Sequence, residues 1–401
     1  MTDMRFASAL AADQAAADSI PALVDSIAGE GPQNPDLALL FTAPTSGAEA
    51  EAQIAALEST LAPTNSIACS AEWVIGNDRE VEERPAATLL AGWGEGMACS
   101  AFELGDTDWK TIFGTPEGLR DHLELDFEPK LFVLLAEPFT APLRHLLPAF
   151  DSAFPATPVV GGVASGGMSP GMTRLSANGR IRDEGVVGLA LGGALEPEII
   201  LSQGCRPIGN EFEVTGAERS QITELDGRKP TLVFRDLYHE LDSDLQSFIR
   251  SGGLLIGIAV DDSEDPPGPS DYLIRNVSGV NPETGAIGVM DLVRSGQVVR
   301  FHVRTPAAAA DDLELLLSPQ AFATAPAAAL LFTCNARGTR LYAEPNRDVG
   351  IVGRAIGRQV PVAGFFANGE LGPVGASNYL HSYSASICLL RPAGERASWP
   401  S

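Results

Sequence analysis

One short segment of the chain brings together a thiol, an amide and a guanidinium group. It reads Cys334-Asn335-Ala336-Arg337-Gly338 and directly follows the apolar stretch 328–333. A guanidinium group binds a carboxylate through two parallel hydrogen bonds, whereas an amide both donates and accepts. Loops at the ends of strands often carry binding residues. This segment is therefore a candidate ligand-binding loop.

A carboxylate follows the next predicted strand, 362–367. It is Glu370, within the segment Asn368-Gly369-Glu370-Leu371-Gly372-Pro373. If the two strands are parallel, both loops leave the same end of the sheet. Cation, amide and carboxylate would then converge in a way that suits a zwitterion such as an amino acid, with Glu370 binding its ammonium group. The alternative is a surface salt bridge between the loops, which is a common and weak interaction.

A second loop has similar chemistry. It covers Ser202–Gly209 after an apolar strand and carries Cys205 and Arg206. Arg206 would either clamp a ligand carboxylate or lower the pKa of the Cys205 thiol. A structural loop with a small buried cysteine is the alternative. Arg206 and Arg337 are thus two candidates for binding the carboxylate of an amino acid, and we expect this loop to share a cleft with Glu370.

Two further candidates lie in one predicted strand. Arg275 and Asn276 belong to the stretch 272–280, in which alternate side chains point to opposite faces. They would line the cleft, or they would belong to an ordinary half-exposed strand. The same two interpretations apply to His381, just before the final strand.

The elements that position these residues recur three times. An apolar strand leads into an amphipathic helix, a turn of small residues and a closing apolar strand, with first strands at 37–42, 131–136 and 328–333 and closing strands at 87–92, 186–191 and 384–390. Small residues let a backbone approach another group closely. We expect an α/β fold of two domains with mixed sheets, internally repeated strand-helix-strand-strand units and helices packed on the sheets.

The chain length agrees with two domains. It has 401 residues, more than one hydrophobic core usually holds. We place an N-terminal helix and connector at 1–35 and a first domain with two repeats at 36–194. A second domain, with a strand-rich insert and the third repeat, is placed at 195–395. The apolar pattern of residues 8–28 predicts the N-terminal helix.

Charge and motif content argue against several functional classes. The formal net charge of −25 repels phosphate backbones and anionic lipids, so we expect no nucleic acid and no membrane partner. The five cysteines are scattered without a C-x-x-C pair, which favours reduced thiols in the cytoplasm. The five histidines are isolated, and the common phosphate-loop, dinucleotide, zinc-protease and serine-hydrolase motifs do not occur. We therefore expect no metal and no cofactor.

The segments described above resemble those of the FIST family, which are sensory domains of bacterial signal-transduction proteins and, beside an F-box, of eukaryotic ubiquitin-ligase adaptors. The similarity extends from about Leu37 to Leu390. The motifs that carry it are Ala68–Glu72, Pro158–Gly162, Ser202–Gly209, Ile274–Val277, Cys334–Gly338 and Gly364–Pro373. The resemblance implies binding of a small ligand, proposed for the family to be an amino acid or a derivative, and provides no catalytic residues.

The function that we expect is ligand sensing in the cytoplasm. No kinase, receiver, methyl-accepting or cyclase segment follows Leu390, so a separate signalling-protein partner would receive the signal. One alternative is a cysteine-dependent hydrolase or transferase that uses Cys205 or Cys334, with His381 as the base. Another is a protein-interaction adaptor that binds no ligand. A pocket with Arg and Glu facing inward would favour the sensor, and a Cys-to-His distance within hydrogen-bond reach would favour the enzyme. A large exposed apolar patch without a pocket would favour the adaptor.

Overall fold

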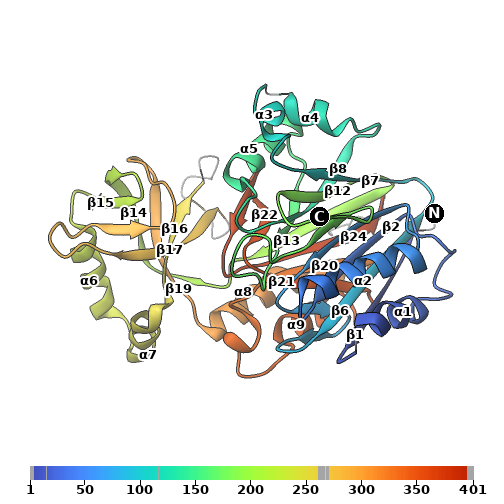
Figure 1. Ribbon diagram of the computed structural model, residues 1–401. Coiled ribbons are helices and arrows are strands. Elements are labelled where there is room, and N and C mark those ends of the chain that lie inside the picture. The colour runs from blue at the N-terminus through green and yellow to red at the C-terminus, as the bar shows by residue number, and fades with distance from the viewer. Residues whose placement is uncertain (1–3, 15, 116, 261–266, 268–270, 395–401) are drawn as a thin grey trace. The chain divides into compact units, whose positions relative to one another are not determined.

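The computed structural model divides the chain into two compact units (Figure 1). It describes residues 4–14, 16–115, 117–260, 267 and 271–394. We call the described residues within 1–202, 313–373 and 377–401 the sheet unit, and those within 203–312 and 374–376 the barrel unit. The fold is mixed α/β.

Three segments of the sheet unit have the same connectivity. In each, a strand, a helix and a parallel second strand are followed by a hairpin and a closing strand antiparallel to the first. The helices of these repeats are α2 (Gly47–Thr60), α5 (Leu143–Ala153) and α9 (Arg347–Ile356). Each repeat is preceded by one more strand, which pairs with its closing strand.

The sheet unit contains three six-stranded sheets with matching strand orders. The first is β1 (Met4–Ala12), β6 (Ala86–Gly94), β2 (Leu37–Ala43), β3 (Asn65–Ser70), β10 (Leu175–Ala177) and β11 (Arg180–Arg182). The second is β7 (Met97–Leu104), β12 (Val186–Gly193), β8 (Pro129–Ala136), β9 (Val159–Val163), β22 (Glu370–Val374) and β23 (Ser377–His381). The third is β13 (Leu195–Ser202), β24 (Ala385–Pro392), β20 (Ala328–Cys334), β21 (Val362–Ala367), β4 (Val74–Gly76) and β5 (Arg79–Val81).

The hairpin of every repeat pairs with a strand of another repeat. Hairpin β4–β5 extends the sheet of the third repeat, β10–β11 that of the first, and β22–β23 that of the second. The turn of β10–β11 is Asn178-Gly179, which the sequence predicts, with φ of 49° and 74°. Positive φ at both positions is typical of a tight type I′ hairpin. The exchange of hairpins brings segments far apart in sequence into contact.

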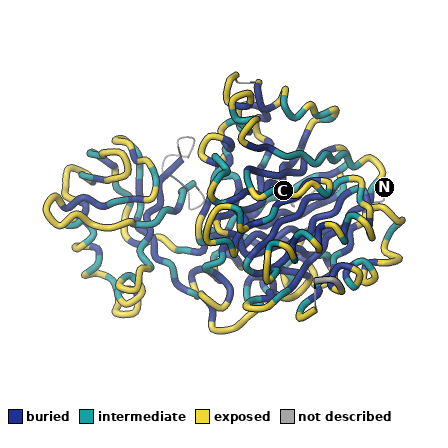
Figure 2. The backbone as a smooth tube through the Cα atoms, in the orientation of Figure 1, coloured by how far each residue is buried: buried dark blue, intermediate teal, exposed yellow. Residues whose placement is uncertain are grey.

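The inner faces of the three sheets share one apolar core. Phe41 of the first repeat contacts Phe332 and Phe365 of the third, with ring centroids 5.9 and 5.2 Å apart. Figure 2 shows these strands as buried along most of their length. Helices α1 (Ala16–Ser26) and α2 cover the outer face of the first sheet, while α3 (Trp109–Ile112), α4 (Gly118–Leu123) and α5 cover that of the second.

The N-terminal segment differs from the sequence prediction. Residues predicted as the start of a helix at position 8 belong to strand β1, and helix α1 begins at Ala16. Met4, Phe6, Ala9 and Ala11 of β1 are buried, and the strand pairs with β6 along its whole length. Alanine has a high helix propensity, but pairing with a neighbouring strand overrides propensity here.

The barrel unit is a closed six-stranded barrel with its own apolar core. Its strands are β14 (Arg206–Glu218), β15 (Gln221–Leu225), β18 (Ile287–Val289), β17 (Tyr272–Val280), β16 (Leu254–Ala259) and β19 (Val298–Val303). Helix α6 (Pro230–Glu240) and helix α7 (Ser243–Phe248) pack on this core, and α7 continues into the helical turn η1 (Ile249–Gly253). The chain leaves this unit within α8 (Pro306–Leu317), which precedes the turn η2 (Ser318–Phe322).

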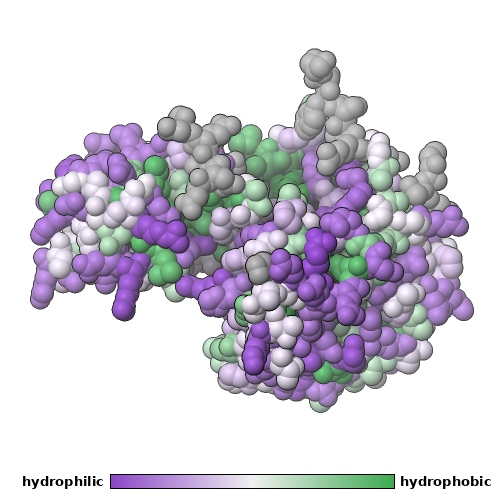
Figure 3. Space-filling model, turned by 90° about the horizontal axis from the view of Figure 1, so that it is seen from above, coloured by the Kyte–Doolittle hydropathy of each residue, from purple (hydrophilic) through white to green (hydrophobic). Residues whose placement is uncertain are grey.

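Hydrophilic residues cover most of the face drawn in Figure 3, with small apolar patches between them. None of the helices in the described part of the chain has the length and apolar character that a membrane span requires. Among the described residues, no group of three or more His, Cys, Asp or Glu side chains is arranged to hold a metal ion.

Candidate functional site

The loop after β20 and the loop after β21 lie next to each other. The two strands are parallel, with Cys334 opposite Ala367. The backbone N–H of Asn335 donates to the carbonyl oxygen of Ala367 at 2.8 Å, and its amide Nδ2 donates to Oδ1 of Asn368 at 3.5 Å. The parallel crossover thus places the loops as the sequence predicts. Asn368 is exposed and Asn335 is half-buried, whereas Cys334 is buried.

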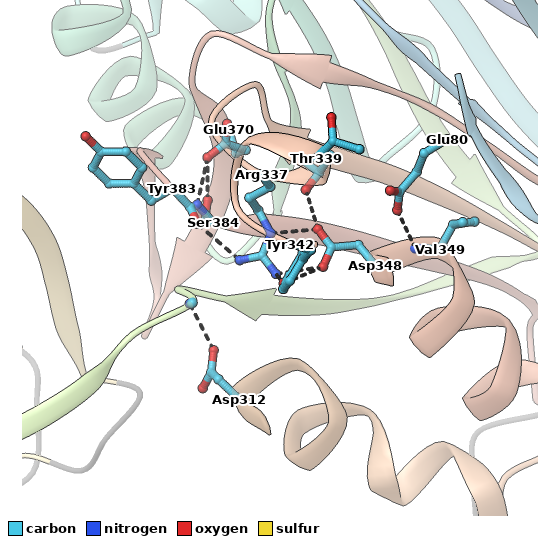
Figure 4. Close-up of polar contacts among 12 residues, drawn as sticks. Glu80, Asp312, Arg337, Thr339, Tyr342, Asp348, Val349, Glu370, Tyr383 and Ser384 are labelled. Atoms are coloured by element: carbon cyan, nitrogen blue, oxygen red, sulfur yellow. Dashed lines mark hydrogen bonds and ion pairs between the residues drawn. The ribbon is translucent and has the colours of Figure 1, made fainter. Parts of the chain in front are cut away.

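Glu370 is fully buried and lies beside Ser384 (Figure 4). Its Oε2 accepts hydrogen bonds from the backbone N–H of Ser384 at 3.1 Å and from Ser384 Oγ at 2.7 Å. Burial raises the pKa of Glu370 to about 8, although the Ser384 hydrogen bonds, the charge of Arg337 and the Cys334 thiol oppose that rise. The carboxyl group is therefore mostly protonated at neutral pH.

Arg337 is also fully buried, and its carboxylate partner belongs to the protein. Its Nε donates to Oδ2 of Asp348 at 2.6 Å, and its Nη2 donates to Oδ1 at 2.8 Å. Nη2 also donates to the hydroxyl of Tyr342 at 2.8 Å, and Nη1 donates to the carbonyl oxygen of Tyr383 at 3.2 Å. Burial alone lowers the pKa of Arg337, but the charge and hydrogen bonds of Asp348 outweigh it and raise the pKa. A ligand contact by Arg337 stays a prediction.

Asp348 connects this cluster to a second buried carboxyl group. It accepts hydrogen bonds from Thr333 Oγ1 and from the Tyr342 hydroxyl, both at 2.9 Å. Burial raises the pKa of the Asp348 carboxyl group. Arg337 and these hydrogen bonds lower it by more than burial raises it, so the pKa lies below its ordinary value. Glu80, from hairpin β4–β5 of the first repeat, accepts from the backbone N–H of Val349 at 2.8 Å. Burial and the charge of Asp348 raise the pKa of Glu80 to about 8.

The three repeats show that the fold does not need a carboxylate at position 370. The matching hairpin positions of the first and second repeats carry the buried residues Val74 and Leu175. All three pair with equivalent residues of a second strand, namely Gly162 for Glu370, Phe365 for Val74 and Cys69 for Leu175. An aliphatic side chain fills this position without the cost of burying an ionisable group. Glu370 therefore differs from its two counterparts in placing an ionisable group at this buried position.

The small-residue turns of the three repeats converge on one another. The backbone N–H of Glu72 donates to Ser165 Oγ at 2.8 Å, and that of Asn368 donates to the carbonyl oxygen of Val163 at 2.9 Å. The backbone N–H of Phe366 donates to the carbonyl oxygen of Trp73 at 3.0 Å. The sequence predicts that the backbone of these turns approaches another group closely. In the structure the turns approach one another.

Sequence reasoning missed Arg340, at the outer edge of the same loop. Its Nη1 donates to Oε2 of Glu72 at 3.0 Å, and its Nη2 donates to Oε1 at 2.5 Å. The guanidinium carbon lies 4.1 Å from the ring centroid of Trp73, and Nη1 also donates to the carbonyl oxygen of Asn335 at 2.9 Å. The sequence feature that could have identified Arg340 is its position three residues after Arg337 in the same loop.

Gly338 begins the short turn η3 (Gly338–Arg340) and is buried with a φ of 56°. A Cβ at this position would lie 2.8 Å from Glu82 Oε2 and from the Phe366 ring. Glycine is therefore required here by both space and backbone conformation. Its role as a ligand-binding residue stays a prediction.

Four predicted site residues belong to the barrel unit. Cys205 is half-buried and Arg206 is exposed at the start of β14. Arg275 Nε donates to Oδ2 of Asp291 at 2.5 Å, and the carbonyl oxygen of Asn276 accepts from the backbone N–H of Met290 at 3.0 Å. A cleft shared by these residues and Glu370 stays a prediction.

His381 belongs to the sheet unit. Its Nε2 lies 3.0 Å from the carbonyl oxygen of Gly372. The enzyme alternative that uses His381 as a base stays a prediction.

Three exchanged-hairpin repeats with an inserted barrel define the class of this α/β protein, and sequence comparison gives its family. The chain matches the FIST N domain over residues 36–228 and the FIST C domain over residues 233–373. It belongs to the FIST family. An uncharacterized protein of Mycobacterium tuberculosis is 36% identical over 379 residues, which are 94% of this chain and 96% of the relative. An uncharacterized protein of Mycobacterium bovis is 36% identical over 386 residues, 94% of this chain and 95% of the relative.

Proposed function

We propose that this FIST protein is a cytoplasmic sensor that binds an amino acid or a related metabolite beside Cys334 and Glu370. A separate signalling protein receives the signal. The observation that carries the proposal is Glu370, a buried carboxyl group at a position where the other two repeats carry Val74 and Leu175. Perturbed ionisable groups in a protein interior often mark functional sites.

The chemistry of Glu370 suits an ammonium group. A buried neutral carboxyl group ionises when a cation is placed beside it, because the opposite charge offsets the loss of hydration. Ser384 already donates two hydrogen bonds to Oε2, which stabilises the ionised form. The Cys334 thiol is a weak donor that an ammonium group can replace. Ligand binding therefore releases the Glu370 proton.

In this proposal the ligand enters past Asn335 and Asn368, which lie at the ends of the two loops. The contact between Asn335 Nδ2 and Asn368 Oδ1 is 3.5 Å long, which makes it a weak hydrogen bond. Opening this contact leaves both amides near the solvent, because Asn368 is exposed and Asn335 is half-buried. In the bound state the amides hydrogen-bond to the polar groups of the ligand.

A thermal-shift screen tests the proposal. The twenty L-amino acids and their N-acetyl derivatives would be tested on wild type, Glu370→Gln and Glu80→Gln. A ligand that binds only the native state raises the unfolding temperature. We expect one or more free amino acids to stabilise wild type and Glu80→Gln, whereas the N-acetyl forms and Glu370→Gln give no shift. Equal shifts for wild type and Glu370→Gln would contradict the proposal.

A cysteine-dependent enzyme is the second candidate, because the Cys334 thiol interacts with the Glu370 carboxyl group and lowers its pKa. Cys334→Ala separates the two functions. The sensor retains its thermal shift in this variant, since the thiol gives way to the ligand. An enzyme would bind its substrate and lose turnover.

A further inference from the structure

The ion pair between Arg340 and Glu72 has the geometry of a ligand contact. Both carboxylate oxygens of Glu72 accept from the two terminal nitrogens of Arg340, at 2.5 and 3.0 Å. Such a planar two-donor contact is how arginine recognises free carboxylates. The hydrogen bonds that Arg340 donates to Glu72 raise the pKa of Arg340, which keeps the guanidinium charged.

The guanidinium group of Arg340 is held in place independently of Glu72. It stacks over the buried indole of Trp73 at 4.1 Å, and Nη1 also donates to the Asn335 carbonyl oxygen. Stacking on an aromatic face and a backbone acceptor together fix the plane of the donor edge. A carboxylate that replaced Glu72 would meet a preorganised arginine.

Exposure distinguishes this pair from the other two-donor pair of the sheet unit. Arg337 and Asp348 are 0% and 1% exposed, so their ion pair is shielded from water in this structure. The side chains of Arg340 and Glu72 are 46% and 28% exposed. Water and solutes compete effectively for an exposed ion pair, which makes it exchangeable.

We propose that Arg340 is the carboxylate-recognition residue of the ligand site and that Glu72 is an internal carboxylate which the ligand displaces. This inference rests on the proposed function. Asn335 connects the two ends of the site, because its carbonyl oxygen binds Arg340 and its neighbour Cys334 contacts Glu370. The ligand class is an amino carboxylate, with its acid on Arg340 and its amine on Glu370.

The displacement also provides a signal. Glu72 precedes hairpin β4–β5 of the first repeat, whereas Arg340 belongs to the third repeat. The ligand therefore removes one tie between two repeats, while the hydrogen bond from the Glu72 backbone N–H to Ser165 remains. A change of contacts between repeats is a differential interaction of the kind that shifts a conformational equilibrium.

The test measures carboxylate binding with the internal competitor removed. Acetate, glycine and methylammonium would be titrated by calorimetry into wild type, Glu72→Gln and Glu72→Gln/Arg340→Lys. We expect acetate and glycine to bind Glu72→Gln about twofold to fivefold more tightly than wild type, as removal of an exposed ion-pair competitor implies. The added lysine change should weaken binding by about tenfold, because lysine lacks the two-donor edge.

Glu51→Gln is the matched control, since it frees Arg174 from an ion pair of 2.6 Å in the same unit. An equal gain in acetate affinity for Glu51→Gln and Glu72→Gln, or no gain for Glu72→Gln, would overturn the inference. A melting profile is recorded for every variant. If the double variant fails to fold, Arg340→Gln takes its place. Methylammonium reports on Glu370 separately. If Glu370→Gln abolishes methylammonium binding but Glu72→Gln does not change acetate binding, the proposed function stands. In that case only the role of Arg340 is removed.

Discussion

Glu370 is an ionisable group in a position that an aliphatic side chain fills in the other repeats. Its folded-state pKa of about 8 lies above the ordinary value of 4.5, so the native protein holds a proton that the unfolded chain releases. The raised pKa of Glu370 stabilises the folded state when the group is protonated. This stabilisation is fully present below pH 4.5 and is lost as the pH rises toward 8. Glu80 behaves in the same way.

The first prediction is that Glu370→Gln weakens the pH dependence of stability. Each of the two groups lowers the free energy of unfolding by about 1 kcal/mol per pH unit between about pH 6.5 and 7.5. Burial lowers the pKa of His302 from its ordinary value of 6.5 to about 4. His302 therefore raises the free energy of unfolding as the pH rises, but only below about pH 6.5. We expect urea unfolding of the variant to show about half the wild-type slope above that pH. An unchanged slope would show that Glu370 is already ionised in the native state.

The second prediction concerns the buried pair of Arg337 and Asp348. Asp348→Asn leaves a buried guanidinium group without its counter-charge, which costs about 3–5 kcal/mol. Glu51→Gln, which removes an exposed partner of Arg174, should change stability by about 1 kcal/mol or less. Chemical denaturation of the two variants measures both values. Similar small losses would mean that the buried pair contributes little.

The sequence predicted part of this site. Cys334, Asn335, Asn368 and Glu370 were placed together correctly, because apolar runs and small residues mark the ends of parallel strands. The partner of Arg337 was not predicted, since Asp348 lies in the first turn of α9, where an acidic residue is ordinary. The geometry of Arg340 could not be predicted, because it depends on Glu72 from another repeat.

At the scale of elements, the exchange of hairpins determines which segments meet. The strand-helix-strand part of each repeat follows from its apolar pattern and its short connections. The partner of each hairpin does not, because the strands of all three hairpins are only three to five residues long and carry little pattern. The strand β1 was missed for a related reason, since its alanines favour a helix until β6 pairs with them.

The third prediction tests the close approach of β20 and β21. A Cβ added at Gly364 would lie 1.7 Å from the carbonyl oxygen of Leu331. Gly364→Ala must separate the strands that carry the site, so we expect a loss of about 3 kcal/mol or more. Gly353→Ala in α9 is the control, because its Cβ would lie 3.9 Å from the Arg358 side chain and it removes a helical glycine. That change should stabilise by up to about 1 kcal/mol, and thermal unfolding compares the two.

At the scale of the whole molecule, the barrel is an insertion between β13 and the third repeat. It lies between β13 and α8, where the first repeat has only the connection through α1. Its core is built from its own residues, among them Val214, Ile256 and Phe301. The sequence predicted strands here but not their closure, because barrel closure depends on the pairing of β14 with β19, far apart along the chain.

The fourth prediction is that the fragment 203–312 folds alone, because a separate core is the physical requirement for independent folding. The heteronuclear NMR spectrum of this fragment should be dispersed, and Phe301→Ala should abolish the dispersion, because it removes a fully buried side chain. A collapsed spectrum for the unmodified fragment would show that the barrel requires the sheet unit.

The central claim is that Glu370 gives up its proton when it binds the ammonium group of a ligand. Calorimetric titration at pH 7 in two buffers of different ionisation enthalpy measures this proton directly. With the amino acid that gives the largest thermal shift, wild type should release about one proton per ligand bound. Glu80→Gln should do the same, and Glu370→Gln should release none. Binding to wild type with the same heat in both buffers would contradict the account.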